Sequence, residues 1–190
     1  MAKEQSQVEF RYYELPPGEI VLAKLGKGWE REYGLGDGRR LHFHNLLEIG
    51  FCYEGEGELV LAGDSFRYHG GSLTVIPENI PHTTISDPGR ICKWEFLFVD
   101  LAGFFRERTI AVFPNQDELV RIIGSGGLFL DRETEPQVAW LVRSMLEECR
   151  KKQRFYQESV KGYLYALFME ILRLHPEISS EGKRLKLTGR

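Results

Sequence analysis

The stretch His42-Phe43-His44-Asn45-Leu46-Leu47-Glu48 says most about the fold and the function of this sequence. In an extended strand, side chains at even separations point to the same face. His42, His44 and Glu48 are therefore predicted to share one face of a strand over Leu41–Tyr53. The other face of this strand has to be covered by further elements, because it is apolar. That face carries Phe43, Leu47, Ile49 and Phe51.

A second motif adds one more histidine. The segment Gly71–His82 contains Pro77 and Pro81, two prolines that force a turn, so His82 starts the next strand. Three imidazoles and a carboxylate that converge inside a barrel suit Fe(II), Mn(II), Ni(II) or Zn(II). Two alternatives stay open: the residues line a polar ligand pocket without metal, or their role is purely structural. Without metal, a buried Glu48 has to find hydrogen-bond donors, such as a protonated histidine, or become neutral.

The first half of the sequence has the pattern of an antiparallel β protein. Up to residue 105, glycines and prolines separate short runs rich in β-branched and aromatic residues, which is typical of a sandwich or barrel. The turn Ala62-Gly63-Asp64-Ser65 favours a hairpin between Glu58–Leu61 and Ser65–His69, because Gly63 and Asp64 tolerate positive φ. The runs expected to form strands include Ile20–Leu25, Leu41–Tyr53, Glu58–Ala62, Leu73–Ile76 and Ile91–Val99.

After residue 105 the hydrophobic period changes from 2 to 3.6, which indicates helices near 116–123, 135–153 and 157–174. The last two helices have wide apolar stripes, which include Leu164 and Leu167. Stripes of this width pack on the barrel or on a second copy of the chain.

Three segments follow from this pattern. Residues 1–105 are predicted to form the barrel, and residues 106–176 a helical segment for dimerisation or signal transmission. Residues 177–190 have no period and are predicted to be a linker or tail.

Composition limits the classes of function. The 190 residues, 42% of them hydrophobic, suit one domain or one domain with a small appendage, and the net charge of −3 gives no overall attraction to nucleic acid. No apolar run reaches the roughly 18 residues of a membrane span, and the polar N-terminal residues Met1–Gln5 lack the apolar stretch expected of a signal peptide. The three cysteines lack CxxC spacing. These features predict a cytoplasmic protein without a membrane span or a disulfide framework.

The two histidine motifs resemble the paired motifs of the cupin family. The first fits the pattern G-x5-H-x-H-x3-E-x6-G, and the second resembles G-x5-P-x-G-x2-H-x3-N, from which it departs at Asn79 and Ser86. The resemblance implies a cupin-type antiparallel β-barrel (a double-stranded β-helix) followed by two or three C-terminal α-helices. It also implies one divalent transition metal as a candidate cofactor, with the ligands His42, His44, Glu48 and His82. The matching positions are Gly36, His42, His44, Glu48, Gly55, Gly71, Pro77 and His82.

The order of elements over residues 8–175 resembles the sensor half of AraC/XylS-type bacterial transcription regulators. It combines the cupin motifs, a Gly55-Glu56-Gly57 turn, an aromatic strand at Trp94–Phe98 and two amphipathic helices. The resemblance implies a non-enzymatic domain that binds a small-molecule effector, a sugar or an organic acid, and forms a homodimer through its C-terminal helices. Family members usually continue with two helix-turn-helix units that bind DNA. None is expected after residue 176, so we expect the sequence to stop before that half.

Three further features are candidates for ligand contact. Trp94 is expected near the cavity mouth, where it would stack on a sugar or aromatic ligand. Arg40 would hold a carboxylate, or else be a solvated surface arginine. The leading arm, with Arg11, Tyr12 and Tyr13, covers the ligand or is a plain edge strand. The alternative function is a metal-dependent cupin enzyme, a dioxygenase or isomerase, that uses His42, His44, Glu48 and His82.

Overall fold

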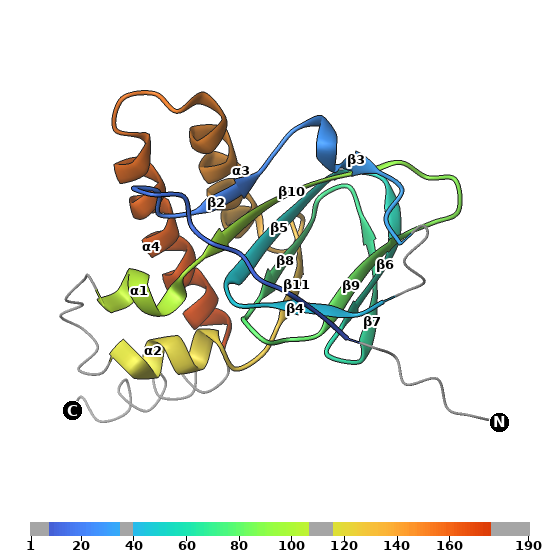
Figure 1. Cartoon of the computed structure of the whole chain (residues 1–190), viewed down its shortest axis with the longest axis horizontal. Coiled ribbons are helices and arrows are strands. Elements are labelled where there is room, and N and C mark those ends of the chain that lie inside the picture. Colours follow the sequence, from blue (N-terminus) through green and yellow to red (C-terminus); the bar gives the residue numbers. More distant parts are fainter. Residues whose placement is uncertain (1–7, 35–39, 107–115, 176–190) are drawn as a thin grey trace, which may run out of the picture.

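The computed structural model describes residues 8–34, 40–106 and 116–175. The tail predicted at 177–190 and the motif glycine Gly36 lie outside the described residues. Two β-sheets face each other in one half of the molecule, and the helices gather in the other half (Figure 1). This arrangement confirms the predicted fold class, mainly β with antiparallel sheets and C-terminal helices.

The first sheet has the strand order β1-β4-β9-β6-β7, and its pairs are antiparallel except β1 with β4. The second follows the order β11-β8-β5-β10-β2, with β3 also paired to β10. The first sheet consists of β1 (Glu9–Arg11), β4 (His42–His44), β6 (Glu56–Leu61), β7 (Asp64–His69) and β9 (His82–Ser86). The second consists of β2 (Leu22–Lys24), β3 (Glu30–Arg31), β5 (Leu47–Glu54), β8 (Ser72–Ile76), β10 (Cys92–Val99) and β11 (Leu128–Asp131).

The strand predicted over 41–53 is in fact two strands in two sheets. Between β4 and β5, Asn45 and Leu46 carry the chain from the first sheet to the second. Hydrogen bonds made by the side chains of His44 and Asn45 stabilise this corner. His44 Nδ1 donates to the Leu46 carbonyl oxygen at 2.7 Å, and the Asn45 side chain pairs with the backbone N–H and C=O of Tyr13 at 2.8 and 2.9 Å. The pattern concealed the break because the alternation of inward and outward side chains continues across the corner.

The side chains of the second sheet fill two separate cores. Trp94, Phe96 and Phe98 point between the sheets, while Leu97 and Val99 on the same strand point toward the helices. The outward face of β5 is buried against the helices, as predicted, through Leu47, Ile49 and Phe51.

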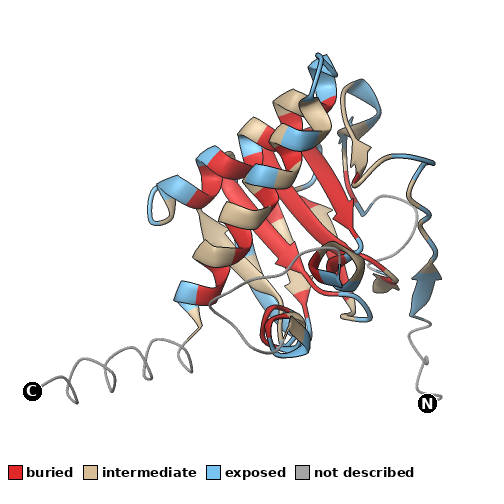
Figure 2. Cartoon of the chain, turned by 90° about the vertical axis from the view of Figure 1, so that its left-hand side faces the viewer, coloured by how far each residue is buried: buried red, intermediate tan, exposed pale blue. Residues whose placement is uncertain are grey.

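The three predicted helices are confirmed as α2 (Gln116–Ile123), α3 (Pro136–Lys151) and α4 (Tyr156–Leu174). The buried faces of α3 and α4 turn toward the second sheet (Figure 2). Leu164 and Leu167 are fully buried within the single chain. Of the two alternatives for these stripes, packing within the chain therefore holds for these two leucines.

Several elements, β3 among them, were not predicted. α1 (Leu101–Arg106) begins directly after β10, inside the segment assigned to the barrel. β11 lies in the segment predicted as helical and pairs antiparallel with β8. Four residues, Leu-Phe-Leu-Asp, are too few to establish a period, so only the pairing with β8 reveals the strand.

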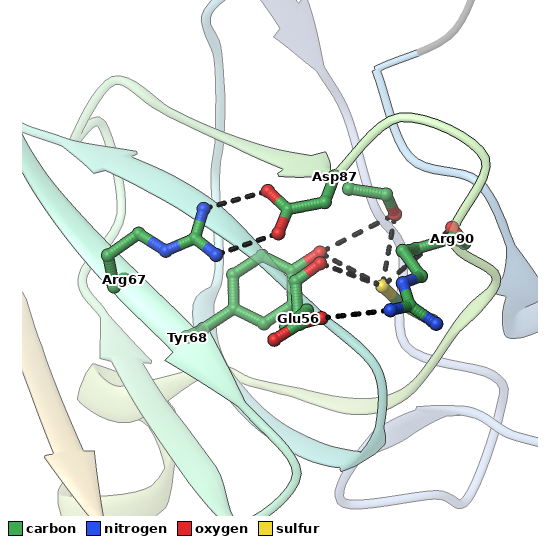
Figure 3. A network of polar contacts seen from close by, with 7 residues as sticks. Glu56, Arg67, Tyr68, Asp87 and Arg90 are labelled. Atoms are coloured by element: carbon green, nitrogen blue, oxygen red, sulfur yellow. Dashed lines mark hydrogen bonds and ion pairs between the residues drawn. The ribbon is translucent and has the colours of Figure 1, made fainter.

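A polar network joins β6, β7 and β9 at the end of β9 farthest from His82 (Figure 3). The Arg67 guanidinium donates to both carboxylate oxygens of Asp87 at 2.7 Å. Beneath this pair, the Tyr68 hydroxyl donates to Cys92 Sγ at 3.2 Å. The Ser86 hydroxyl also donates to Cys92 Sγ at 3.1 Å, so the network ties the end of β9 to the start of β10.

None of the helices within the described ranges has both the length and the apolar character that crossing a membrane requires.

Candidate functional site

Two strands of the first sheet bring His42 and His82 face to face. The two residues are register partners across β4 and β9, and their ring centroids lie 4.2 Å apart. β5 supplies Glu48 from the second sheet. One ligand atom from each of His42, Glu48 and His82 lies within 4.8 Å of the others. The structure thus brings three of the four predicted residues into one close cluster, and the fourth, His44, contacts Glu48.

Backbone carbonyls fix the orientation of two of the imidazoles. Nδ1 of His44 lies 2.7 Å from the Leu46 oxygen, and Nδ1 of His82 lies 2.9 Å from the Ile80 oxygen. A carbonyl accepts only, so both Nδ1 atoms carry the proton, and both Nε2 atoms are directed toward Glu48. Oε2 of Glu48 lies 3.2 Å from His44 Nε2 and 3.7 Å from His82 Nε2.

The electrostatics of the cluster follow from this geometry. Burial by itself raises the pKa of Glu48, but the hydrogen bond from His44 and the nearby imidazole of His82 outweigh it and hold this pKa below its usual range. Burial likewise lowers the pKa of His82, and the Glu48 carboxylate reverses this to a net rise. His42 lacks such a partner, so burial and the neighbouring His82 lower its pKa to about 3. Glu48 has thus found the donors that a buried carboxylate requires.

A divalent transition metal fits the donors in this cluster. Among the described residues, His42 Nδ1 and His82 Nε2 are buried side-chain nitrogens without a hydrogen-bond partner. Such atoms are costly to bury unless something binds them. Two imidazoles and one carboxylate form a common ligand set for such metals, and a carbonyl bonded to the other ring nitrogen is the usual support of a ligating histidine. His44 already contacts Glu48 and is not one of the three residues of this close cluster.

The cluster opens into a cavity of about 100 Å³ between the two sheets. Arg40 lines this cavity, as do His42, Glu48 and His82. The other lining residues come from the leading arm, from the segment around β3, and from β9 and β10. They are Arg11, Tyr13, Trp29, Arg31, Tyr33, Gly34, Thr83, Thr84, Phe96 and Phe98.

The prediction that Trp94 lies near the cavity mouth is wrong. Trp94 is fully buried and does not line the cavity. Its ring stacks on Phe96 at 5.8 Å and contacts Tyr68 edge to face at 5.1 Å. The strand period placed Trp94 on the correct inward face, but it could not show how deep along the strand the cavity extends.

The model of one protein family, described as AraC-like ligand binding domain, matches residues 31–168. The chain belongs to this family. A comparison with curated proteins found no match.

Solved structures similar to this AraC-like domain include ToxT from Vibrio cholerae, an AraC-family regulator. An apo ToxT variant shares 12% identity over 82% of this chain and 57% of its own, with a TM-score of 0.52. A second ToxT structure has the same identity and coverage and a TM-score of 0.50. ToxT bound to an unsaturated fatty acid shares 11% identity over 80% of this chain and 54% of its own, with a TM-score of 0.45. The first two likenesses show a shared fold, and the chain spans 57% of the length of those ToxT chains.

The AraC-like cavity contains residues that sequence reasoning missed. Trp29, Arg31 and Tyr33 come from a segment with neither a helical nor a strand period, so no pattern marked them. Phe96 and Phe98, which the sequence marked only as part of an aromatic strand, also line the cavity. For the arm, the structure shows the edge strand: β1 lies at the edge of the first sheet. Arg11 and Tyr13 of the arm also line the cavity.

Proposed function

We propose that this AraC-like domain senses an effector for a bacterial transcription regulator. A small molecule binds in the cavity between the sheets and controls a DNA-binding domain elsewhere in the whole protein. The observation that supports this most directly is the buried cluster of His42, Glu48 and His82 at a solvent-connected cavity, in a chain whose family is one of ligand-binding domains. The proposed effector is a sugar or an organic acid, and the proposed location is the cytoplasm.

A thermal-shift screen of small sugars and organic acids against the purified chain tests effector binding. A compound that binds the native state raises the melting temperature. His82→Gln should remove this shift, because His82 lines the cavity, and His69→Gln is the matched control. His69 is an exposed histidine paired with Asp131 on the second sheet. If the variant at His82 keeps the full shift, effector binding in this cavity is refuted.

We also propose that His42, Glu48 and His82 hold one divalent metal, Fe, Mn, Ni or Zn, with His44 beside Glu48. When bound, such an ion supplies Lewis-acid character at the cavity wall. His44 and His82 would keep their Nδ1 protons on backbone carbonyls and present Nε2 inward. Elemental analysis of protein purified without a histidine tag should find about one equivalent of metal, and His42→Ala should remove it. A metal-free wild-type protein would contradict the metal proposal.

Homodimerisation is proposed through the outer face of α3 and α4. The inner stripes of these helices are buried within the chain, but Trp140 is 54% exposed and contacts the Tyr163 ring at 5.7 Å. A groove of about 600 Å³ lies beside this aromatic pair. Light scattering should therefore show a dimer for the wild type and a folded monomer for Trp140→Glu. A wild-type monomer at high concentration would refute this interface.

One observation favours a second candidate function, a metal-dependent enzyme. Two histidines and one carboxylate are also the ligand set of non-haem oxygenases with open coordination positions. Turnover of a bound compound by metal-loaded protein, lost in Glu48→Ala, would favour the enzyme. Binding without turnover favours the sensor.

A further inference from the structure

We infer that the effector is a small carboxylate, held by an anion subsite that Arg11, Arg31 and Arg40 form at the mouth of the cavity. This inference rests on the proposed function and chooses between the two effector classes proposed there. The three guanidiniums come from β1, from β3 and from the residues just before β4, and all line the same cavity as the histidine cluster.

The wall of this cavity has an excess of positive charge. Among the described lining residues, Glu48 is the one carboxylate, and it faces the imidazoles of His44 and His82. Arg31 and Arg40 are exposed as well as lining the cavity, which places them at its rim. Three guanidiniums along the wall of one cavity favour entry of an anion over a neutral sugar.

The three arginines of the cavity keep guanidinium N–H groups available for a ligand. Among the described residues, neither Arg31 nor Arg40 has a carboxylate within ion-pair distance. Arg11 uses Nε and Nη2 on Glu9 Oε2, at 3.1 and 2.8 Å. Because Glu9 is 52% exposed, water screens this pair, and it competes weakly with a ligand.

Arg31 is held in place before any ligand arrives. Its guanidinium lies over two aromatic rings, 5.2 Å from the Trp29 centroid and 4.7 Å from the Tyr33 centroid. A guanidinium stacked on its flat face keeps its N–H groups free in the plane, where a carboxylate accepts two of them. Stacking therefore reduces the conformational entropy that Arg31 loses on binding.

The size of the cavity limits the anion. A volume of about 100 Å³ suits an acid of a few carbons. With the carboxylate on the arginines, the remainder of the molecule extends toward His42, Glu48 and His82, where imidazole nitrogens bind an oxygen substituent. The occupant that fits is thus a short hydroxy acid or dicarboxylate.

Matched acids and amides test this inference. Glycolate, lactate, malonate and succinate are titrated calorimetrically, at constant ionic strength, against EDTA-treated protein, so that no metal mediates binding. Each acid is compared with its neutral amide of nearly equal shape. At least one acid should bind about tenfold or more tightly than its amide. Arg31→Gln and Arg40→Gln should each weaken the binding of that acid about tenfold. Arg173→Gln should leave the affinity for that acid unchanged, because Arg173 is an exposed arginine on α4 that pairs with Glu170.

Three results would overturn the anion subsite: amides that bind as tightly as the acids, unchanged affinity in both cavity variants, or no binding by any of the four acids. Each leaves the proposed function standing if a neutral sugar gives a thermal shift that His82→Gln removes. If the whole screen of sugars and acids gives no shift that depends on His82, the proposed function itself fails.

Discussion

At the scale of single residues, the site depends on which atoms carry protons. His44 and His82 each bind a backbone carbonyl through Nδ1, so their second nitrogens are fixed toward Glu48. His42 has a buried, unpartnered Nδ1. The cluster thus combines oriented ligands with unsatisfied atoms, an arrangement that the burial of polar groups disfavours unless a ligand or ion completes it.

The three cysteines test the burial of the two cores. Cys52, Cys92 and Cys149 are free and buried. Burial raises the pKa of Cys52 to about 12 and that of Cys149 to about 11, so at pH 8 both are almost wholly in the unreactive thiol form. A disulfide-exchange reagent at pH 8 should label none of the three rapidly in folded protein and all three in urea. Rapid labelling of Cys52 before unfolding would contradict the described packing.

Gly57 and Gly162 allow a matched test of stability, because a Cβ would be crowded at the first and free at the second. A Cβ on Gly57 would lie 2.1 Å from the Ile85 carbonyl oxygen and 2.6 Å from the Tyr68 hydroxyl, whereas one on Gly162 in α4 would meet nothing within 4 Å. Gly57→Ala should therefore cost about 1–3 kcal/mol through overpacking. Gly162→Ala should gain about 0.5–1 kcal/mol from helix propensity. Urea denaturation measures both, and equal effects of the two changes would count against the close approach of β6 and β9.

At the scale of elements, the helical hairpin is part of the barrel's own core. Leu167 is fully buried in the cluster shared by the second sheet and the helices. Leu167→Ala should lower the free energy of unfolding by about 2–5 kcal/mol. Because the contact lies within one chain, the loss should not depend on protein concentration. A stable variant that only dissociates from dimer to monomer would show that Leu167 serves an interface instead.

Glu95 connects the cavity wall to α3. It is 1% exposed, accepts a hydrogen bond from the Gly26 N–H at 3.0 Å, and pairs with Arg150 at 2.5 Å. Gly26 precedes the short 3-10 helix η1 (Lys27–Trp29), which ends at Trp29 on the cavity wall. This chain of contacts is a physical route between the cavity and the helices.

Replacing Arg150 should show how much its ion pair with the buried Glu95 carboxylate contributes to the free energy of unfolding. Arg150→Met leaves Glu95 without its cation and should cost about 1–3 kcal/mol. Adding Glu95→Gln should recover part of the loss, because a neutral amide needs no counter-charge. Glu147→Gln, which removes the exposed partner of Arg150, should change little. Urea denaturation of wild type, Arg150→Met, Glu95→Gln and the double variant gives the coupling, and additive effects would argue against an ion pair between Glu95 and Arg150.

At the scale of the whole molecule, the features that could be predicted from the sequence are those that depend on residues close together along the chain. The histidine motifs are compact and stay in phase with the strand period, so their convergence was predictable. The helices follow from period and capping. The corner after His44, the strand β11 and the depth of Trp94 depend on contacts between distant segments, and no local pattern encodes them. Arg31 was missed for the same reason, because tertiary packing alone brings it to the cavity.

The most direct test of the proposed function is the output of a reporter gene in a strain that carries the whole protein. Wild type, His82→Gln and His69→Gln are compared across a panel of sugars and organic acids, with protein levels and melting temperatures measured alongside. The account predicts that at least one compound changes reporter output for wild type and for the variant at His69. It predicts no such change for the folded variant at His82. A response in that variant equal to wild type would contradict effector sensing in the cavity between the two sheets.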